Sequence, residues 1–135
     1  MELREYFDNH EGTGVLATAD SEGKVNVAVY SRPHFLGDDD SQIAFIMNDR
    51  LSHDNVVSNP QAAYLFIEHG EGHVGKRLFL TKTGEETDQD KIRSMRRRKK
   101  SADEEADKKR FLVHFRVDGV RPLIGTGEDR PASDH

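Results

Sequence analysis

The stretch that decides the fold runs from Phe45 to Glu68 and reads FIMNDRLSHDNVVSNPQAAYLFIE. An apolar run ends at Met47, a polar turn follows, and the pair Asn59-Pro60 stands before a second apolar run. Because proline neither continues a helix nor donates to a strand ladder, Asn59-Pro60 marks a boundary between two elements. The stretch therefore predicts a strand, a short helix over residues 51–58 and a second strand.

The polar turn gathers five side chains at the predicted helix start: Asn48, Asp49, Arg50, Ser52 and His53. Backbone N–H groups at a helix start lack intrahelical partners and carry partial positive charge. With a guanidinium, a hydroxyl and an imidazole beside them, the turn is suited to hold a phosphate. The alternative interpretation is ordinary capping, with Asp49 or Ser52 as the N-cap and Arg50 in solvent.

The flanking sequence predicts a β-rich domain. A short helix is expected over residues 2–9, and strands are expected over Val15–Ala19, Val25–Phe35, Gln42–Met47, Ala62–Ile67, Lys76–Thr83 and from Phe111 onward. The fourth strand is apolar without alternation, which is typical of a strand covered on both faces. The sixth strand alternates apolar and polar residues, so one core face is expected.

Three segments carry a resemblance: GVLATADSEGKVNVAVY, DRLSHDNV and SNPQAAYLF, in this order and spacing. Together they resemble the pyridoxamine 5'-phosphate oxidase-like flavoproteins, the FMN-binding split barrels. The resemblance covers residues 10–84 and resumes at 111–125. It implies a mainly β, six-stranded antiparallel split β-barrel forming one domain over residues 1–125. It also implies FMN as the cofactor and a homodimer with the flavin at the interface.

The resemblance implies that the flavin ring lies along the second strand and that the polar turn takes the phosphate. Many relatives carry a lysine in or beside this turn. Here Leu51, Ser52 and His53 stand instead, so Arg50 must carry more of the charge. The implied cofactor-binding residues are Val27, Ala28, Val29, Tyr30, Ser31, Arg32, Met47, Asn48, Asp49, Arg50, Ser52, His53 and Arg77. For Arg32 a rim salt bridge, and for Arg77 a surface position on a strand, are the alternatives.

The function implied is that of a flavin-dependent oxidoreductase acting on a small acceptor, with NAD(P)H or a small molecule as redox partner. The biosynthetic oxidase itself is not expected, because its arginine and histidine pattern is missing after Phe111. The alternatives are a non-enzymatic flavin-binding or electron-transfer module, or a relative that binds deazaflavin or haem. A haem would need His34, His53 or His114 as a ligand. The sequence names no catalytic residue.

Composition narrows the classes of function. The formal net charge of −5 argues against nucleic-acid binding. The absence of cysteine excludes disulfides and thiolate chemistry, and no metal site is expected. No apolar stretch has the length of a membrane span or the character of a signal peptide, so a cytoplasmic protein is expected. With 34% hydrophobic residues the core is modest, which favours burial through dimerisation.

Residues 85–110 interrupt the strand pattern with charge. They hold ten of the 20 lysines and arginines, together with eight acidic residues. The simpler interpretation is a solvated helical insertion, and the alternative is a lid that presents cations to a phosphate-bearing substrate or a nicotinamide cofactor. The polar tail over residues 126–135 is expected to be disordered.

Overall fold

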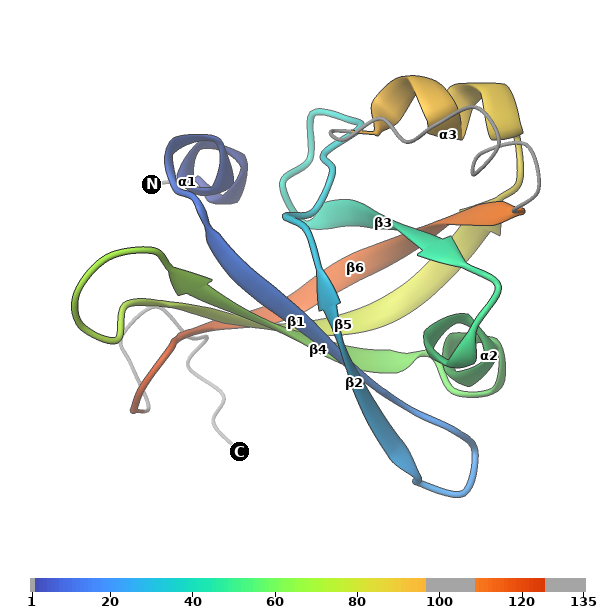
Figure 1. Cartoon of the computed structure of the whole chain (residues 1–135), viewed down its shortest axis with the longest axis horizontal. Coiled ribbons are helices and arrows are strands. Elements are labelled where there is room, and N and C mark those ends of the chain that lie inside the picture. The colour runs from blue at the N-terminus through green and yellow to red at the C-terminus, as the bar shows by residue number, and fades with distance from the viewer. Residues whose placement is uncertain (1, 97–108, 126–135) are drawn as a thin grey trace.

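The computed structural model describes residues 2–96 and 109–125 and confirms the predicted fold class. Within these residues, six antiparallel strands curl into a half-barrel that is accompanied by three short helices (Figure 1). None of these helices is long and apolar enough to cross a membrane. In chain order the elements are α1 Leu3–Asn9, β1 Gly12–Ala19, β2 Val25–Tyr30, β3 Gln42–Asn48, α2 Leu51–Ser58, β4 Gln61–Glu68, β5 Gly75–Glu86, α3 Gln89–Met95 and β6 Arg110–Pro122.

The sheet has the order β2-β1-β4-β5-β6-β3, so β2 and β3 are its two edge strands. In the described residues only one isolated bridge, His34 to Ala44, joins the segment after β2 to β3. We call the side where β2 and β3 face each other without sheet pairing the open seam. Because the barrel does not close there, the unpaired edge of β2 offers backbone N–H and C=O groups to a ligand.

β2 is shorter than predicted, and the expectation of a strand through Phe35 is wrong beyond Tyr30. The Tyr64 hydroxyl donates to the Ser31 carbonyl at 2.9 Å, and Arg32 donates to the Phe7 carbonyl at 2.8 Å. Pro33 then removes a backbone donor. These contacts turn the chain away from β1.

β5 is longer than predicted and extends from Gly75 to Glu86. Its pairing with β6 shifts register between Phe79 and Leu80 and again between Lys82 and Gly84. Such bulges bend a strand and increase its twist. Figure 1 shows β5 and β6 crossing the molecule together as long curved strands.

The charged insertion is described only in part. It contains α3, whose N-cap Asp88 accepts hydrogen bonds from the backbone N–H groups of Asp90 and Lys91. Residues 97–108, which are 12 of the 26 residues of the proposed lid, and the tail from residue 126 lie outside the described residues. The disorder expected for the tail therefore stays a prediction.

The core lies inside the half-barrel and contains Phe45 of β3, Tyr64 and Phe66 of β4, and Phe115 of β6. The other face of β4 is only half-buried in the single chain, so the expected cover on both faces is incomplete.

At the start of β6 the expectation of a single core face is wrong. Leu112 lies on the face opposite to Phe111 and is fully buried. It packs with Ala44 and with Ile92 of α3, so the insertion helix covers this part of the sheet.

Candidate functional site

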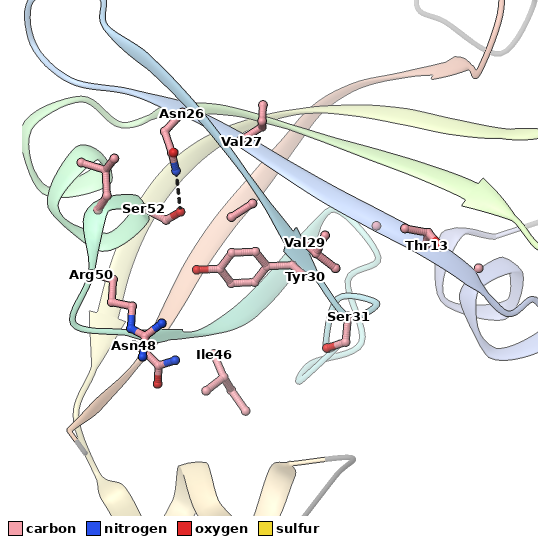
Figure 2. Close-up of a pocket in the computed structure, with 14 residues that line it drawn as sticks. Thr13, Asn26, Val27, Val29, Tyr30, Ser31, Ile46, Asn48, Arg50 and Ser52 are labelled. Atoms are coloured by element: carbon pink, nitrogen blue, oxygen red, sulfur yellow. Dashed lines mark hydrogen bonds between the residues drawn. The ribbon is translucent and has the colours of Figure 1, made fainter. Parts of the chain in front are cut away.

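A pocket of about 940 Å³ lies along the open seam. One wall is β2, the other is the end of β3 with the start of α2, and part of β1 contributes as well. Figure 2 shows these side chains around the hollow. The lining residues are Gly12, Thr13, Gly14, Asn26, Val27, Ala28, Val29, Tyr30, Ser31, Ile46, Asn48, Arg50, Leu51 and Ser52.

Tyr30 links the two walls of the pocket. Its hydroxyl points from β2 toward the turn that carries Arg50 and Ser52 (Figure 2). Burial raises the pKa of this hydroxyl, while hydrogen bonding to Ser52 and the positive charge of Arg50 lower it to a smaller extent. The net pKa lies above the usual value, so Tyr30 is a neutral hydrogen-bonding group at physiological pH.

The polar end of the pocket is the start of α2. Arg50 is the N-cap of this helix and makes no side-chain cap, so the expectation of Asp49 or Ser52 as the N-cap is wrong. Asn26 donates to the Ser52 hydroxyl at 3.3 Å, which ties β2 to the helix start. The Arg50 side chain is exposed and forms no ion pair with any residue in the described ranges. The uncapped N–H groups, a hydroxyl and a guanidinium therefore converge on one end of the pocket.

Eight of the thirteen predicted site residues line this pocket. They come from β2 and from the turn before α2, which the fold brings face to face across the open seam. Their role in binding a cofactor stays a prediction. The eight residues are Val27, Ala28, Val29, Tyr30, Ser31, Asn48, Arg50 and Ser52.

Three of the other five predicted residues point elsewhere. Arg32 donates to the carbonyl oxygens of Phe7 and His10, and so fixes the end of α1. Met47 is fully buried in the core. Arg77 donates to the backbone oxygens of Pro122 at 2.9 Å and Gly125 at 2.5 Å, outside the pocket lining.

The remaining two, Asp49 and His53, lie beside the pocket rather than in its lining. His53 is buried, and its ring stacks on Phe111 with centroids 3.6 Å apart. Its Nε2 lies 3.1 Å from a carboxylate oxygen of Glu85. Asp49 is exposed and lies close to His53 and Asp54.

Several lining residues were not predicted as site residues. Gly12 and Gly14 lie on β1, where a Cβ at Gly14 would come within 1.9 Å of the Tyr64 hydroxyl oxygen. Asn26, a polar residue within an apolar strand, was the available signal for the contact with Ser52. Thr13, Ile46 and Leu51 gave no such signal.

A second surface feature lies on the outer face of the sheet. Val25, Val27 and Val29 of β2 are 79%, 65% and 76% exposed. Val29 pairs with Val15 of β1, which in turn pairs with Leu65 of β4, so all three lie in one row. We call the set of Val15, Val25, Val27, Val29 and Leu65 the valine face. An exposed apolar patch of this kind is typical of an interaction surface.

The comparison with protein families gives a match over nearly the whole chain. The family model described as pyridoxamine 5'-phosphate oxidase matches residues 2–123. A comparison with curated proteins gives no match.

Solved structures of the same shape include HupZ of Group A Streptococcus, with a TM-score of 0.68, 16% identity and cover of 94% of this chain and 95% of that chain. An FMN-binding protein of Syntrophomonas wolfei has a TM-score of 0.68 and 18% identity, with cover of 92% and 85%. A structure named F420 reductase has a TM-score of 0.62 and 17% identity, with cover of 86% and 94%. At such low identity these structures support the fold alone.

Proposed function

The chain belongs to the pyridoxamine 5'-phosphate oxidase family, and from this premise we propose that its open-seam pocket binds FMN. We further propose that the protein is a flavin-dependent oxidoreductase acting on a small acceptor. The observation that carries the proposal is the convergence of Arg50, Ser52 and the uncapped start of α2 on one end of the pocket.

The phosphate of FMN fits the chemistry of that end. A phosphate near neutral pH is a strong acceptor that binds cations and backbone N–H donors. Arg50 offers a guanidinium with no ion-pair partner in the described part of the chain. No side chain caps α2, so no capping side chain competes with a ligand for the first backbone N–H groups of the helix. Binding a phosphate here would satisfy groups that the fold leaves available.

The flavin ring fits the remainder of the pocket. The edge strand β2 offers backbone donors and acceptors for a pyrimidine edge, and Ala28 and Ile46 offer apolar cover. A volume of about 940 Å³ suits a ligand of cofactor size. FMN is proposed rather than FAD because the sequence lacks a glycine-rich dinucleotide fingerprint.

The flavin would supply the redox chemistry, while the protein would orient it and tune it through hydrogen bonds and charge. Tyr30 and Ser52 are neutral hydrogen-bonding groups of the same pocket as Arg50. NAD(P)H is the proposed electron donor. An absorption spectrum of the freshly purified protein, followed by addition of NADH or NADPH, tests the assignment. Bleaching of the flavin band supports an enzyme, and a stable oxidised flavin supports a binding or electron-transfer module.

The likeness to a structure named F420 reductase favours a deazaflavin as the second candidate cofactor. Deazaflavin and flavin have different absorption bands, so the same spectrum distinguishes them. A colourless protein without affinity for either would contradict both candidates.

We also propose that two copies of the chain pair through the valine face. Burying three exposed valines of β2 and the half-buried Leu65 of β4 would remove this apolar area from water. Because β2 is also a wall of the pocket, such pairing would place the flavin next to the interface.

The first prediction concerns the phosphate. Arg50→Ala is expected to weaken FMN binding by roughly ten- to a hundredfold, because a hydrogen bond to a charged group is worth about 1.5–3 kcal/mol. Riboflavin lacks the phosphate, so its affinity should not change. Calorimetric titration of both flavins into wild type and variant measures the difference.

Lys24→Ala removes an exposed cation from the β1–β2 turn and serves as the matched charge control. Arg32→Ala should cost less FMN affinity than Arg50→Ala, because Arg32 contacts backbone oxygens rather than the pocket. If riboflavin binds wild type as tightly as FMN, or if Arg50→Ala weakens both flavins equally, the phosphate assignment is wrong.

A further inference from the structure

We propose that Asp49, His53 and Asp54 form a binding site for a divalent transition metal such as Zn²⁺. One ligand atom from each residue lies within 4.8 Å of the ligand atoms of the other two. The sequence alone predicts no metal site, because the chain has no cysteine to complete a structural zinc site. In the structure the turn before α2 places Asp49 beside His53 and Asp54.

The ring of His53 supplies the main argument. The residue is 6% exposed, and its Nδ1 is buried with no hydrogen-bond partner in the described residues. A buried polar atom without a partner is costly, by roughly 1–3 kcal/mol, and such atoms are rare in native structures. The atom therefore calls for an explanation, and a bound ion provides one.

The contact made by the other ring nitrogen, Nε2, determines whether Nδ1 has a lone pair for a ligand. Nε2 lies 3.1 Å from a carboxylate oxygen of Glu85, which accepts hydrogen bonds. The proton of a neutral ring is thus held at Nε2, and Nδ1 keeps a free lone pair. A carboxylate that orients a histidine through its far nitrogen is the usual outer contact of a metal-binding imidazole. Lys82, 2.9 Å from the same oxygen, in turn holds Glu85 in place.

The two carboxylates complete the donor set. Asp49 and Asp54 are exposed, so their side chains can rotate toward an ion beside Nδ1. A cation between the two carboxylates is attracted to both of them. One imidazole nitrogen with two carboxylate oxygens suits Zn²⁺, whereas Mg²⁺ and Ca²⁺ prefer oxygen ligands only.

This site is separate from the proposed flavin pocket. None of its three residues lines that pocket, although Arg50 and Ser52 between them in the sequence do. Metal binding can therefore be measured on the flavin-free protein, and its failure would leave the FMN proposal untouched.

The test is calorimetric titration of the untagged full chain with Zn²⁺ and, separately, Mg²⁺. One Zn²⁺ per chain is expected, with no comparable binding of Mg²⁺. Asp49→Asn combined with Asp54→Asn should weaken Zn²⁺ binding by at least tenfold. Glu85→Gln should weaken it by roughly tenfold, the usual effect of losing an outer-shell partner. In NMR spectra, Zn²⁺ should shift the ring protons of His53 and leave those of His34 unchanged.

Asp8→Asn combined with Asp38→Asn is the matched control. It removes the same charge from another exposed acidic cluster, and Zn²⁺ affinity should be retained. Absence of Zn²⁺ binding would overturn the proposal. Equal affinity in wild type and the Asp49, Asp54 variant, or a Zn²⁺ response from histidines other than His53, would overturn it as well.

Discussion

At the scale of single residues, the closeness of Gly14 to two tyrosines shapes the pocket. A Cβ at Gly14 would lie 1.9 Å from the Tyr64 hydroxyl oxygen and 2.6 Å from the Tyr30 carbonyl oxygen. Tyr64 is fully buried and donates to the Ser31 carbonyl, so it has little freedom to move aside. Only glycine allows β1 to pass this close to the segment that forms the pocket wall.

We therefore expect Gly14→Ala to lower the free energy of unfolding by about 1–3 kcal/mol, the usual range for an overpacked site. Urea unfolding measures this change. Gly37→Ala is the matched control, because nothing lies within 4 Å of its added Cβ and its φ is not positive. Its effect should stay within about 0.5 kcal/mol. Equal effects at both glycines would contradict the steric argument.

The sequence predicted residue types at the site better than side-chain directions. Asn59-Pro60 marks the end of α2 in the sequence, and the apolar run that ends at Met47 precedes the helix. The helix start beside Arg50 and Ser52 could therefore be predicted. Met47 alternates into the core, and Arg77 finds acceptors in the chain after β6. Those outcomes depend on neighbours distant in sequence, which local patterns do not encode.

At the scale of elements, two side-chain carboxyl groups connect β5 to β6 in addition to the backbone hydrogen bonds between these strands. Glu86 of β5 accepts a hydrogen bond from Lys91 Nζ at 2.8 Å and lies 2.6 Å from His114 Nε2 of β6. These contacts, Lys91 first and His114 second, hold the pKa of Glu86 below its usual value.

Asp118 of β6 makes the second connection. It accepts hydrogen bonds from the Thr81 hydroxyl at 2.5 Å and from Arg116 Nε at 2.7 Å. Burial raises the pKa of this carboxyl, but the two hydrogen bonds outweigh burial and leave the pKa lowered.

Stability should consequently depend on pH in the acid range. A carboxyl whose pKa is lower in the folded state stabilises the protein above its unfolded pKa of about 4, and that stability is lost as pH falls through the folded value. We expect Glu86→Gln combined with Asp118→Asn to lose less unfolding free energy than wild type between about pH 5 and about pH 3. Urea unfolding across this range, with chelator present, is the measurement.

Glu11→Gln combined with Glu22→Gln provides the control, since these exposed side chains have no hydrogen-bond partner among the described residues. This control should follow the wild-type pH profile. Parallel profiles for all three proteins would mean that the contacts of Glu86 and Asp118 contribute nothing to acid sensitivity.

The lengths of β2 and β5 mark the limit of prediction at this scale. Pro33 was visible in the sequence, yet the strand end at Tyr30 also depends on bonds from Tyr64 and Arg32. The extension of β5 to Glu86 depends on bulges and on pairing with β6. Strand ends are thus set by partners as well as by composition.

At the scale of the whole molecule, the exposed valine face leads to a prediction of the oligomeric state. We expect a homodimer with twice the chain mass of 15.3 kDa in light scattering at micromolar concentration. Val27→Asp combined with Val29→Asp should produce a monomer, because charge on an apolar interface opposes its burial.

Leu36→Asp places a single aspartate at an exposed apolar residue in the loop between β2 and β3 and is the control. It should remain dimeric. A wild-type protein with the mass of a single chain would contradict the dimer and the interfacial position of the flavin together.

The topology also fixes an order of assembly. β1 and β2 are joined by a short turn, as are β4 and β5, so each pair can form as soon as its residues exist. β3 has β6 as its sheet partner, with Gln42 opposite Arg116 and Asn48 opposite Arg110. When β3 pairs with β6, the chain between them forms a long loop. Closing this loop costs conformational entropy before the hydrogen bonds between the strands compensate for it.

A chain leaving the ribosome therefore holds β3 without its sheet partner until β6 has been synthesised, which is nearly the whole domain. The β1–β2 hairpin, which can form first, supplies one wall of the pocket. The other wall includes β3, which pairs only after β6 has been synthesised. The cofactor pocket is consequently complete only in a finished chain, and any nascent chain that stops before β6 lacks it.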